Sequence, residues 1–219
     1  MLFRSAASNT KISVLGQFQG KLSAVQTALD ALQTPANFAS AISSSNSGVA
    51  TAQSTGNLTA GRYSLNVTQT AEAALVNLAG YHSASDAIPV DTTYSFQVGT
   101  APAVTYTAPA NATLSDLVTW VNSQPTLMGQ VQASIVQASG NQYVLSLQGL
   151  QTGASHDLTV TTSQTGVSVD AHPAQDAKFT LNNIIFTRAS NTVSDVVSGM
   201  TLNLIQSGTT VLQAGNSDT

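Results

Sequence analysis

The chain has 219 residues, of which only 7% are charged, and its formal net charge is −4. Ordinary soluble proteins have roughly 25% charged residues, so Ser, Thr, Asn and Gln must supply most of the polar surface here. The 6 Lys and Arg residues are scattered and form no basic stripe, which argues against nucleic-acid binding and binding to anionic membranes. The chain has no cysteine, which excludes disulfides, thiolate metal sites and cysteine nucleophiles.

Neither a membrane span nor an ordinary export signal is expected from the sequence. No apolar run approaches the length of roughly 18 residues that a membrane-spanning helix needs. The first residues, MLFRSAASNTK, lack the long apolar core that follows the basic flank of a signal peptide. If the protein works outside the cell, we expect it to leave by another route.

Residues 8–33 are predicted to form a helix, with Asn9 or Thr10 as its cap and Pro35 just beyond its end. Its apolar residues recur at alternating steps of three and four, which is a heptad pattern. The helix can be an ordinary core-facing helix or half of a coiled coil whose partner lies outside this sequence. We favour the second interpretation because no second long heptad helix follows. The predicted packing seam of this stalk helix consists of Leu15, Phe18, Leu22, Val25, Leu29 and Leu32.

The segment after the helix contains few regular signals. Residues 36–60 are rich in Ala, Ser, Thr and Asn, and residues 43–48 have the composition of a loop. Residues 63–68 alternate in polarity and are predicted to form a strand. Residues 71–78 are compatible with a short helix or with the end of a strand.

Residues 93–163 are predicted to form a unit of hairpins around one short helix. Residues 94–98 and 104–107 alternate as a first hairpin, and residues 131–147 form a second one around Gly140-Asn141. Thr113 and Asp116 have the spacing of a capping box, which predicts a helix to about residue 122. Residues 158–162 add a strand.

The stretch from 174 to 206 is predicted to repeat this design. Residues 177–181 and 184–187 alternate around Asn182-Asn183, a pair that tolerates the backbone of a tight hairpin turn. Residues 192–195 again have capping-box spacing and predict one helical turn that ends at Gly199. Residues 200–205 alternate as a strand. We interpret the two stretches as an internal ββα repeat, although two segments can also converge on such a common local design.

No catalytic, cofactor-binding or metal-binding site is predicted, and an enzyme is not expected. The sequence contains no phosphate loop, nucleophile elbow or metalloprotease helix, and Glu72 is its single glutamate. The histidines are far apart, and their glycine, serine and proline neighbours are typical of surface loops. We expect no three of the remaining candidates to converge: His82, Asp86, His156, Asp157, Asp170, His172 and Asp176.

Three segments resemble one known family. The run from Asp176 to Leu204, which includes residues 190–197, Gly199 and Thr201, resembles the middle region of the flagellar filament cap protein, also called hook-associated protein 2. Residues 11–16, followed by Leu22 and Leu29, are similar to the family's N-terminal helical segment. Residues 61–69 are similar to its first core strand. Residues 71–173 match the family mainly at residues 114–117 and Asn122.

The resemblance implies a fold and a domain organisation. It implies an α+β, mainly β chain, in which an N-terminal stalk helix is followed by two small β-rich domains, one inserted within the other. Residues 1–45 would form the stalk, part of a coiled-coil leg. Residues 46–70 and 175–219 would form the outer domain, and residues 71–174 the inserted domain with one short helix.

The resemblance also implies a function. It implies a structural cap at the distal end of the bacterial flagellar filament, which promotes the folding and insertion of flagellin. The implied partners are further copies in a ring, flagellin and neighbouring hook-associated proteins, and no nucleic acid. The implied location is extracellular, at the flagellum tip, after export through the flagellum itself.

Two other function classes are compatible with the composition. A surface adhesin or other extracellular filament subunit would share the low charge and the Ser- and Thr-rich strands, and it could contact a host surface or mucin. A secreted glycan-binding or glycan-degrading module should present clusters of exposed aromatics, but Trp120 is the single tryptophan. The heptad stalk favours the cap over both alternatives.

Overall fold

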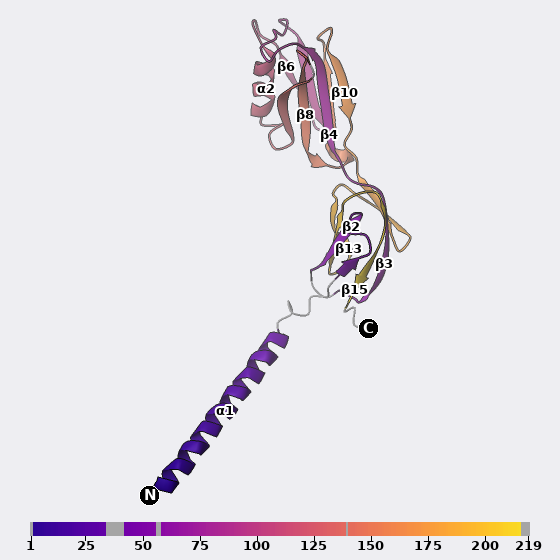
Figure 1. Ribbon diagram of the computed structural model, residues 1–219. Helices are drawn as coiled ribbons and strands as arrows, with labels where there is room; N and C mark the ends of the chain where they lie inside the picture. Colours follow the sequence, from indigo (N-terminus) through magenta and orange to yellow (C-terminus); the bar gives the residue numbers. More distant parts are fainter. Residues whose placement is uncertain (1, 34–41, 56–57, 139, 216–219) are drawn as a thin grey trace.

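The computed structural model describes residues 2–33, 42–55, 58–138 and 140–215. A helix, α1 (Leu2–Gln33), precedes two β units that lie end to end, and α1 extends away from both (Figure 1). At about 1.5 Å per residue, the 32 residues of α1 extend over about 48 Å. The chain is therefore mainly β with an N-terminal helix, as the sequence predicts.

We call the β unit nearer to α1 the outer unit. It contains a five-stranded sheet, in the order β1-β15-β3-β11-β12, and a three-stranded sheet, in the order β13-β14-β2. All its strand pairs are antiparallel, and their inner faces enclose one apolar core that includes Leu65, Phe179 and Leu202. Its strands are β1 (Ile42–Ser44), β2 (Ala50–Ser54), β3 (Gly61–Gln69), β11 (Ala177–Leu181), β12 (Ile184–Arg188), β13 (Thr192–Val197), β14 (Met200–Leu204) and β15 (Gly208–Ala214).

We call the second β unit the inserted unit, because its strands lie between β3 and β11 in the sequence. A four-stranded sheet, β10-β4-β8-β7, faces a three-stranded sheet, β6-β5-β9, and α2 covers the same core (Figure 1). That core includes Tyr94, Phe96 and Leu117. Its elements are β4 (Ala73–Tyr81), β5 (Thr93–Val98), β6 (Val104–Thr107), α2 (Leu114–Ser123), β7 (Val131–Gln137), β8 (Tyr143–Thr152), a 3-10 turn (Ala154–His156), β9 (Leu158–Thr162) and β10 (Ser168–His172).

Local chemistry explains several elements that the sequence predicts. α2 begins at a complete capping box: the Thr113 side chain accepts from the Asp116 N–H, and the Asp116 carboxylate accepts from the Thr113 N–H. Asn182 and Asn183 have φ angles of 49° and 65°, as the two-residue turn between β11 and β12 requires. The predicted hairpins β5–β6 and β7–β8 and the strand β9 are also confirmed.

The predicted helical turn at residues 192–195 is wrong, because this segment is strand β13. It pairs with β14, and the turn at Gly199, where φ is 79°, connects the two strands. Val193, Val196 and Val197 are β-branched, which favours a strand over a helix. The interpretation of an internal ββα repeat is therefore wrong in its last element.

Other differences concern short or weakly patterned segments. The predicted start of the stalk helix at residue 8 is wrong, because α1 continues through Asn9 and Thr10 to Leu2. Residues 43–48 are predicted to form a loop, but β1 includes the first two of them and pairs with β15. Residues 71–78, which the sequence left open, lie mostly in β4. Pro35 lies outside the described residues.

Candidate assembly surface

A stripe of large apolar side chains on α1 is exposed to solvent. Leu15 and Phe18 are 65% and 66% exposed, and every residue from 13 to 30 is exposed to solvent. Leu22, Val25 and Leu29 continue the stripe at 51–56% exposure. The side chain of Leu32, the last residue of the predicted seam, lies outside the described residues. Exposed apolar stripes of this size usually mark association surfaces, and the heptad spacing is suited to another helix.

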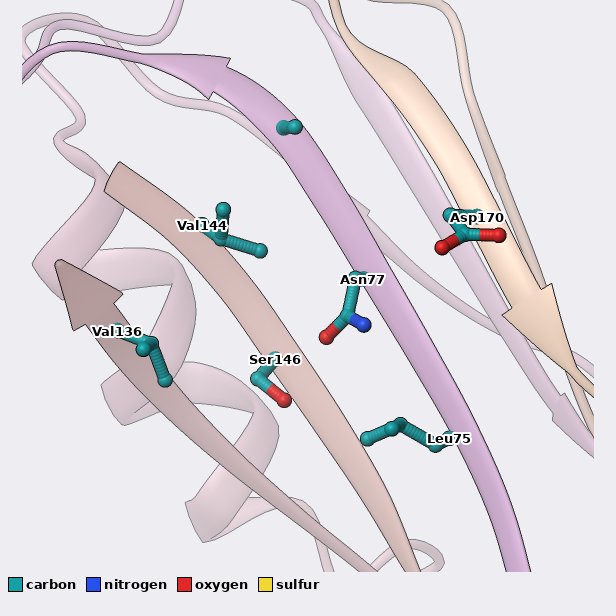
Figure 2. Close-up of a pocket in the computed structure, with 7 residues that line it drawn as sticks. Leu75, Asn77, Val136, Val144, Ser146 and Asp170 are labelled. Atoms are coloured by element: carbon teal, nitrogen blue, oxygen red, sulfur yellow. The ribbon is translucent and has the colours of Figure 1, made fainter. Parts of the chain in front are cut away.

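A second candidate surface lies on the solvent-facing side of the sheet β10-β4-β8-β7. It contains an open hollow of about 510 Å³, lined by Leu75, Asn77, Ala79, Val136, Val144, Ser146 and Asp170. Figure 2 shows Asn77 between Asp170 and Ser146 on neighbouring strands. Asn77 lies directly between Asp170 on β10 and Ser146 on β8 in the strand register. Asp170 is the single charged residue among these lining residues, and no aromatic residue is among them. The hollow is therefore a shallow part of the sheet surface with apolar and uncharged polar side chains and one carboxylate. It provides no nucleophile with an adjacent base.

The structure places most titratable candidates in separate loops. His82 Nδ1 lies 3.7 Å from an Asp86 carboxylate oxygen, and the same carboxylate accepts from the His82 N–H and the Ser83 hydroxyl. The bond from the His82 backbone is the largest cause that lowers the Asp86 pKa, followed by the Ser83 bond. The carboxylate thus closes a local turn rather than facing a pocket.

The other candidates bind backbone groups. His156 Nδ1 lies 3.1 Å from the carbonyl oxygen of Thr152, and Asp157 accepts from the Ala174 N–H at 2.9 Å. Asp176 accepts from the Ala154 N–H at 2.8 Å. His172 and Asp170 lie on β10, which is exposed along its whole length. In the part of the chain that the structure describes, no group of three His, Asp or Glu side chains is placed to hold a metal ion.

The inserted unit has a charge pattern that the sequence analysis missed. Residues 74–174 contain Asp but no Glu, Lys or Arg, so this unit has no fixed positive charge. Charge counted per unit, rather than over the whole chain, is the signal that would have revealed this pattern. Copies of the inserted unit should repel one another weakly through these charges. Its acidic residues are Asp86, Asp91, Asp116, Asp157 and Asp170.

Two pairs of polar contacts anchor the elements around these surfaces. The Asn191 side chain accepts from the Ala71 N–H at 2.7 Å and donates to the Ala71 carbonyl at 2.9 Å. Asn122 makes the same paired contact with Ala133, at 2.8 and 3.0 Å, and so fixes α2 against β7. Both asparagines belong to the family resemblance found in the sequence, but their partners are backbone groups, 11 residues away for Asn122 and 120 residues away for Asn191, and backbone groups give no sequence signal.

Among the described residues, no helix is both long enough and apolar enough to cross a membrane. The described architecture is thus a long helix with an exposed heptad stripe, followed by two β units whose polar groups serve structure. A long helix with an exposed heptad stripe is typical of a subunit of a larger assembly, and this is the class of protein that the fold indicates.

Comparison with known proteins identifies the family. The family model for the flagellar hook-associated protein 2 N-terminus matches residues 4–74, and the model for its C-terminus matches residues 174–215. The two matches flank the inserted unit. The chain belongs to the flagellar hook-associated protein 2 family.

Curated relatives agree with this assignment. The chain is 28% identical over 211 residues to the flagellar hook-associated protein 2 of Escherichia coli, with 88% of this chain and 44% of that protein covered. It is 27% identical over 224 residues to the B-type flagellar hook-associated protein 2 of Pseudomonas aeruginosa, covering 90% of this chain and 47% of that protein. The chain thus spans about half the length of the curated relatives it matches, and their names describe flagellar hook-associated proteins.

Solved structures agree in fold. The D2-D3 domains of the flagellar cap protein FliD from Escherichia coli match with a TM-score of 0.68 at 27% identity, covering 82% of this chain and 99% of that chain. FliD from Pseudomonas aeruginosa matches with a TM-score of 0.60 at 20% identity, covering 78% of this chain and 86% of that chain. At that identity the second likeness concerns the fold alone.

Proposed function

We propose that this chain is part of a cap at the distal end of a bacterial flagellar filament, where it promotes the folding and insertion of flagellin. The observation that carries the proposal is the likeness to the Escherichia coli cap protein D2-D3 domains, which this chain covers over 99% of their length. The relatives are flagellar proteins by name, which favours the cap over a surface adhesin or a host-binding filament subunit.

The proposed domain boundaries follow the two apolar cores. Residues 46–70 and 175–219 form the outer domain, and residues 71–174 form the inserted domain. Two separate clusters of buried residues support this division, since one contains Leu65 and Phe179 and the other contains Tyr94 and Leu117. The residues before Ile42 belong to a stalk that positions these domains above the growing end of the filament. The stalk predicted over residues 1–45 is shortened at its end, because β1 pairs with β15 and so belongs to the outer unit.

The proposed partners are further copies of the chain, flagellin and neighbouring hook-associated proteins. The seam Leu15, Phe18, Leu22, Val25, Leu29 and Leu32 packs against another stalk helix in the assembled cap. Support comes from the exposure of the described members of this seam. Outside the cell, at the filament tip, the subunit needs no ordinary signal peptide if it is exported through the flagellum.

A chimera tests the proposed function. The matched region of the Escherichia coli cap protein is replaced by this chain, and the chimera is expressed in cells that lack their own cap. We expect assembled filaments and little free flagellin in the medium. The control chimera keeps the Escherichia coli D2-D3 domains and exchanges the remaining matched residues.

The result that contradicts the proposal is a chimera that reaches the filament tip while flagellin is shed as monomer. Electron microscopy with an antibody against the inserted unit locates the chimera. Failure of the test chimera to reach the tip, when the control chimera does so, also counts against the proposal.

A further inference from the structure

The chain crosses between the two cores twice, and the crossings bind each other. Ala71 lies in the outer core and Ala74 in the inserted core, so the first crossing passes through Glu72. The return crossing passes through Gln175. Glu72 and Gln175 form an isolated antiparallel bridge, in which each N–H donates to the other's carbonyl, at 2.9 and 3.1 Å. Two neighbouring crossings of this kind make a ribbon, which by itself can bend and twist.

A third point of contact lies beside this ribbon, where β8 ends. The Thr152 hydroxyl donates to the Ala189 carbonyl of the outer unit at 2.6 Å. Two residues later, the Ala154 N–H donates to the Asp176 carboxylate at 2.8 Å. Both bonds join the end of β8 to segments that follow the inserted unit in the sequence. A contact outside the ribbon restrains the rotation that the ribbon alone allows.

Gly153 brings the two backbones into direct contact at this point. Its φ angle is 101°, which L side chains rarely adopt, and its N–H donates to the Glu72 carbonyl at 3.2 Å. A Cβ on Gly153 would lie 2.5 Å from the Ala189 Cβ and 2.9 Å from its Cα. The missing side chain is therefore what lets the two loops touch.

We propose that the close contact between Gly153 and Ala189, together with the hydrogen bonds of the Thr152 and Asp176 side chains, locks the two β units into one rigid body. Linked domains ordinarily move relative to one another unless a large interface prevents it. Here a small set of contacts replaces a large interface: the bridge between Glu72 and Gln175, the bond from Thr152 to Ala189 and the bond from Ala154 to Asp176. The inference concerns this chain alone and does not depend on the proposed function.

The test measures the distance between two spin labels on the full chain. Because the sequence has no cysteine, Val90→Cys and Ile185→Cys create the two labelling sites. Val90 is 60% exposed in the inserted unit, and Ile185 is 79% exposed in the outer unit. Pulsed electron paramagnetic resonance then reports the distance distribution. We expect one narrow peak for the labelled parent chain.

Two variants are compared with matched controls. Thr152→Val with Asp176→Ala removes both side-chain bonds, whereas Thr152→Ser with Asp176→Asn keeps a donor and an acceptor. Gly153→Ala adds a Cβ that would collide with Ala189, whereas Gly61→Ala adds a Cβ that meets nothing within 4 Å. We expect the peak to broaden, by about twofold, in the two test variants and to stay narrow in the controls, because domains without a rigid contact move relative to one another.

Circular dichroism and Trp120 fluorescence show whether each variant keeps its fold. Broadening in either test variant that remains folded supports the lock. If Gly153→Ala fails to fold, the near-isosteric Thr152→Val variant with Asp176→Ala decides. A broad distribution in the parent chain overturns the proposal, and so does an unchanged narrow peak in all folded test variants.

Discussion

The hydroxyl groups of Tyr81 and Tyr94 meet inside the inserted unit, at 3.0 Å from each other. Tyr94 also donates to the Gln164 side chain. Both rings are at most 2% exposed, and burial is the largest cause that raises the pKa of each hydroxyl. The fold thus favours the neutral form of both residues.

This pair makes the inserted unit sensitive to alkali. Each folded pKa lies above the unfolded value of about 10, so the stabilisation is complete below about pH 10 and is lost as the pH rises further. We expect Tyr81→Phe to lower the free energy of unfolding by about 1 kcal/mol at neutral pH and to make its alkaline decline shallower. Urea unfolding at several pH values, followed by Trp120 fluorescence, measures both. An alkaline decline identical to that of the parent contradicts this account.

Asn191 has a comparable role in the outer unit. Its side chain satisfies both backbone polar groups of Ala71, which is 4% exposed. Asn191→Ala leaves these groups without that partner, and we expect a loss of about 1–3 kcal/mol in the free energy of unfolding. The control is Asn203→Ala, at an exposed position on the otherwise largely buried β14, with an expected change within about 0.5 kcal/mol. Urea unfolding followed by far-UV circular dichroism compares them, and equal effects contradict the assignment.

At the scale of elements, two segments with the same capping-box spacing adopt different structures. Thr113 caps α2, whereas Thr192 is exposed at the start of β13. We expect Thr113→Ala to lower the free energy of unfolding by about 1 kcal/mol and Thr113→Ser to change it little, since both hydroxyls can cap. Thr192→Ala should have almost no effect. Thermal and urea unfolding of the three variants test this, and an equal loss for both alanine variants contradicts it.

These two segments show what the sequence can and cannot predict. Around Thr113, the capping box and an apolar face of Leu114, Leu117 and Val121 both indicate a helix, and the prediction is right. Around Thr192, the cap predicts a helix while the valines favour a strand, and pairing with β14 decides the outcome. Strands without an apolar alternation, such as the wholly exposed β10, give almost no signal of their own.

The candidate surfaces also differ in how far the sequence predicts them. The heptad stripe on α1 is visible in the sequence because its residues repeat locally, and the exposure of its described members agrees with the spacing. The sheet face around Asn77 is assembled from four strands whose register only the fold defines. The lock at Gly153 depends on Ala189, which lies on the other side of the return crossing, so spacing along the chain does not reveal it.

At the scale of the whole molecule, we expect the 219-residue chain to associate only weakly by itself. With 7% charged residues there is little repulsion between copies, and the apolar positions of the β units are used in their two cores. The remaining hydroxyl and amide faces form modest, wet interfaces. A closed ring can nevertheless be stable when stalk helices raise the effective concentration of each weak contact.

The central claim is that the α1 seam drives assembly, and molar mass measured against concentration tests it most directly. Light scattering compares this chain, a chain lengthened at both ends by the flanking residues of the longer Escherichia coli relative, and the lengthened chain with Phe18→Ser and Leu22→Ser. We expect weak self-association of the first, a closed ring of the second, and loss of the ring in the third. A stable ring of the 219-residue chain at low micromolar concentration, or a strictly monomeric lengthened chain, would contradict the claim.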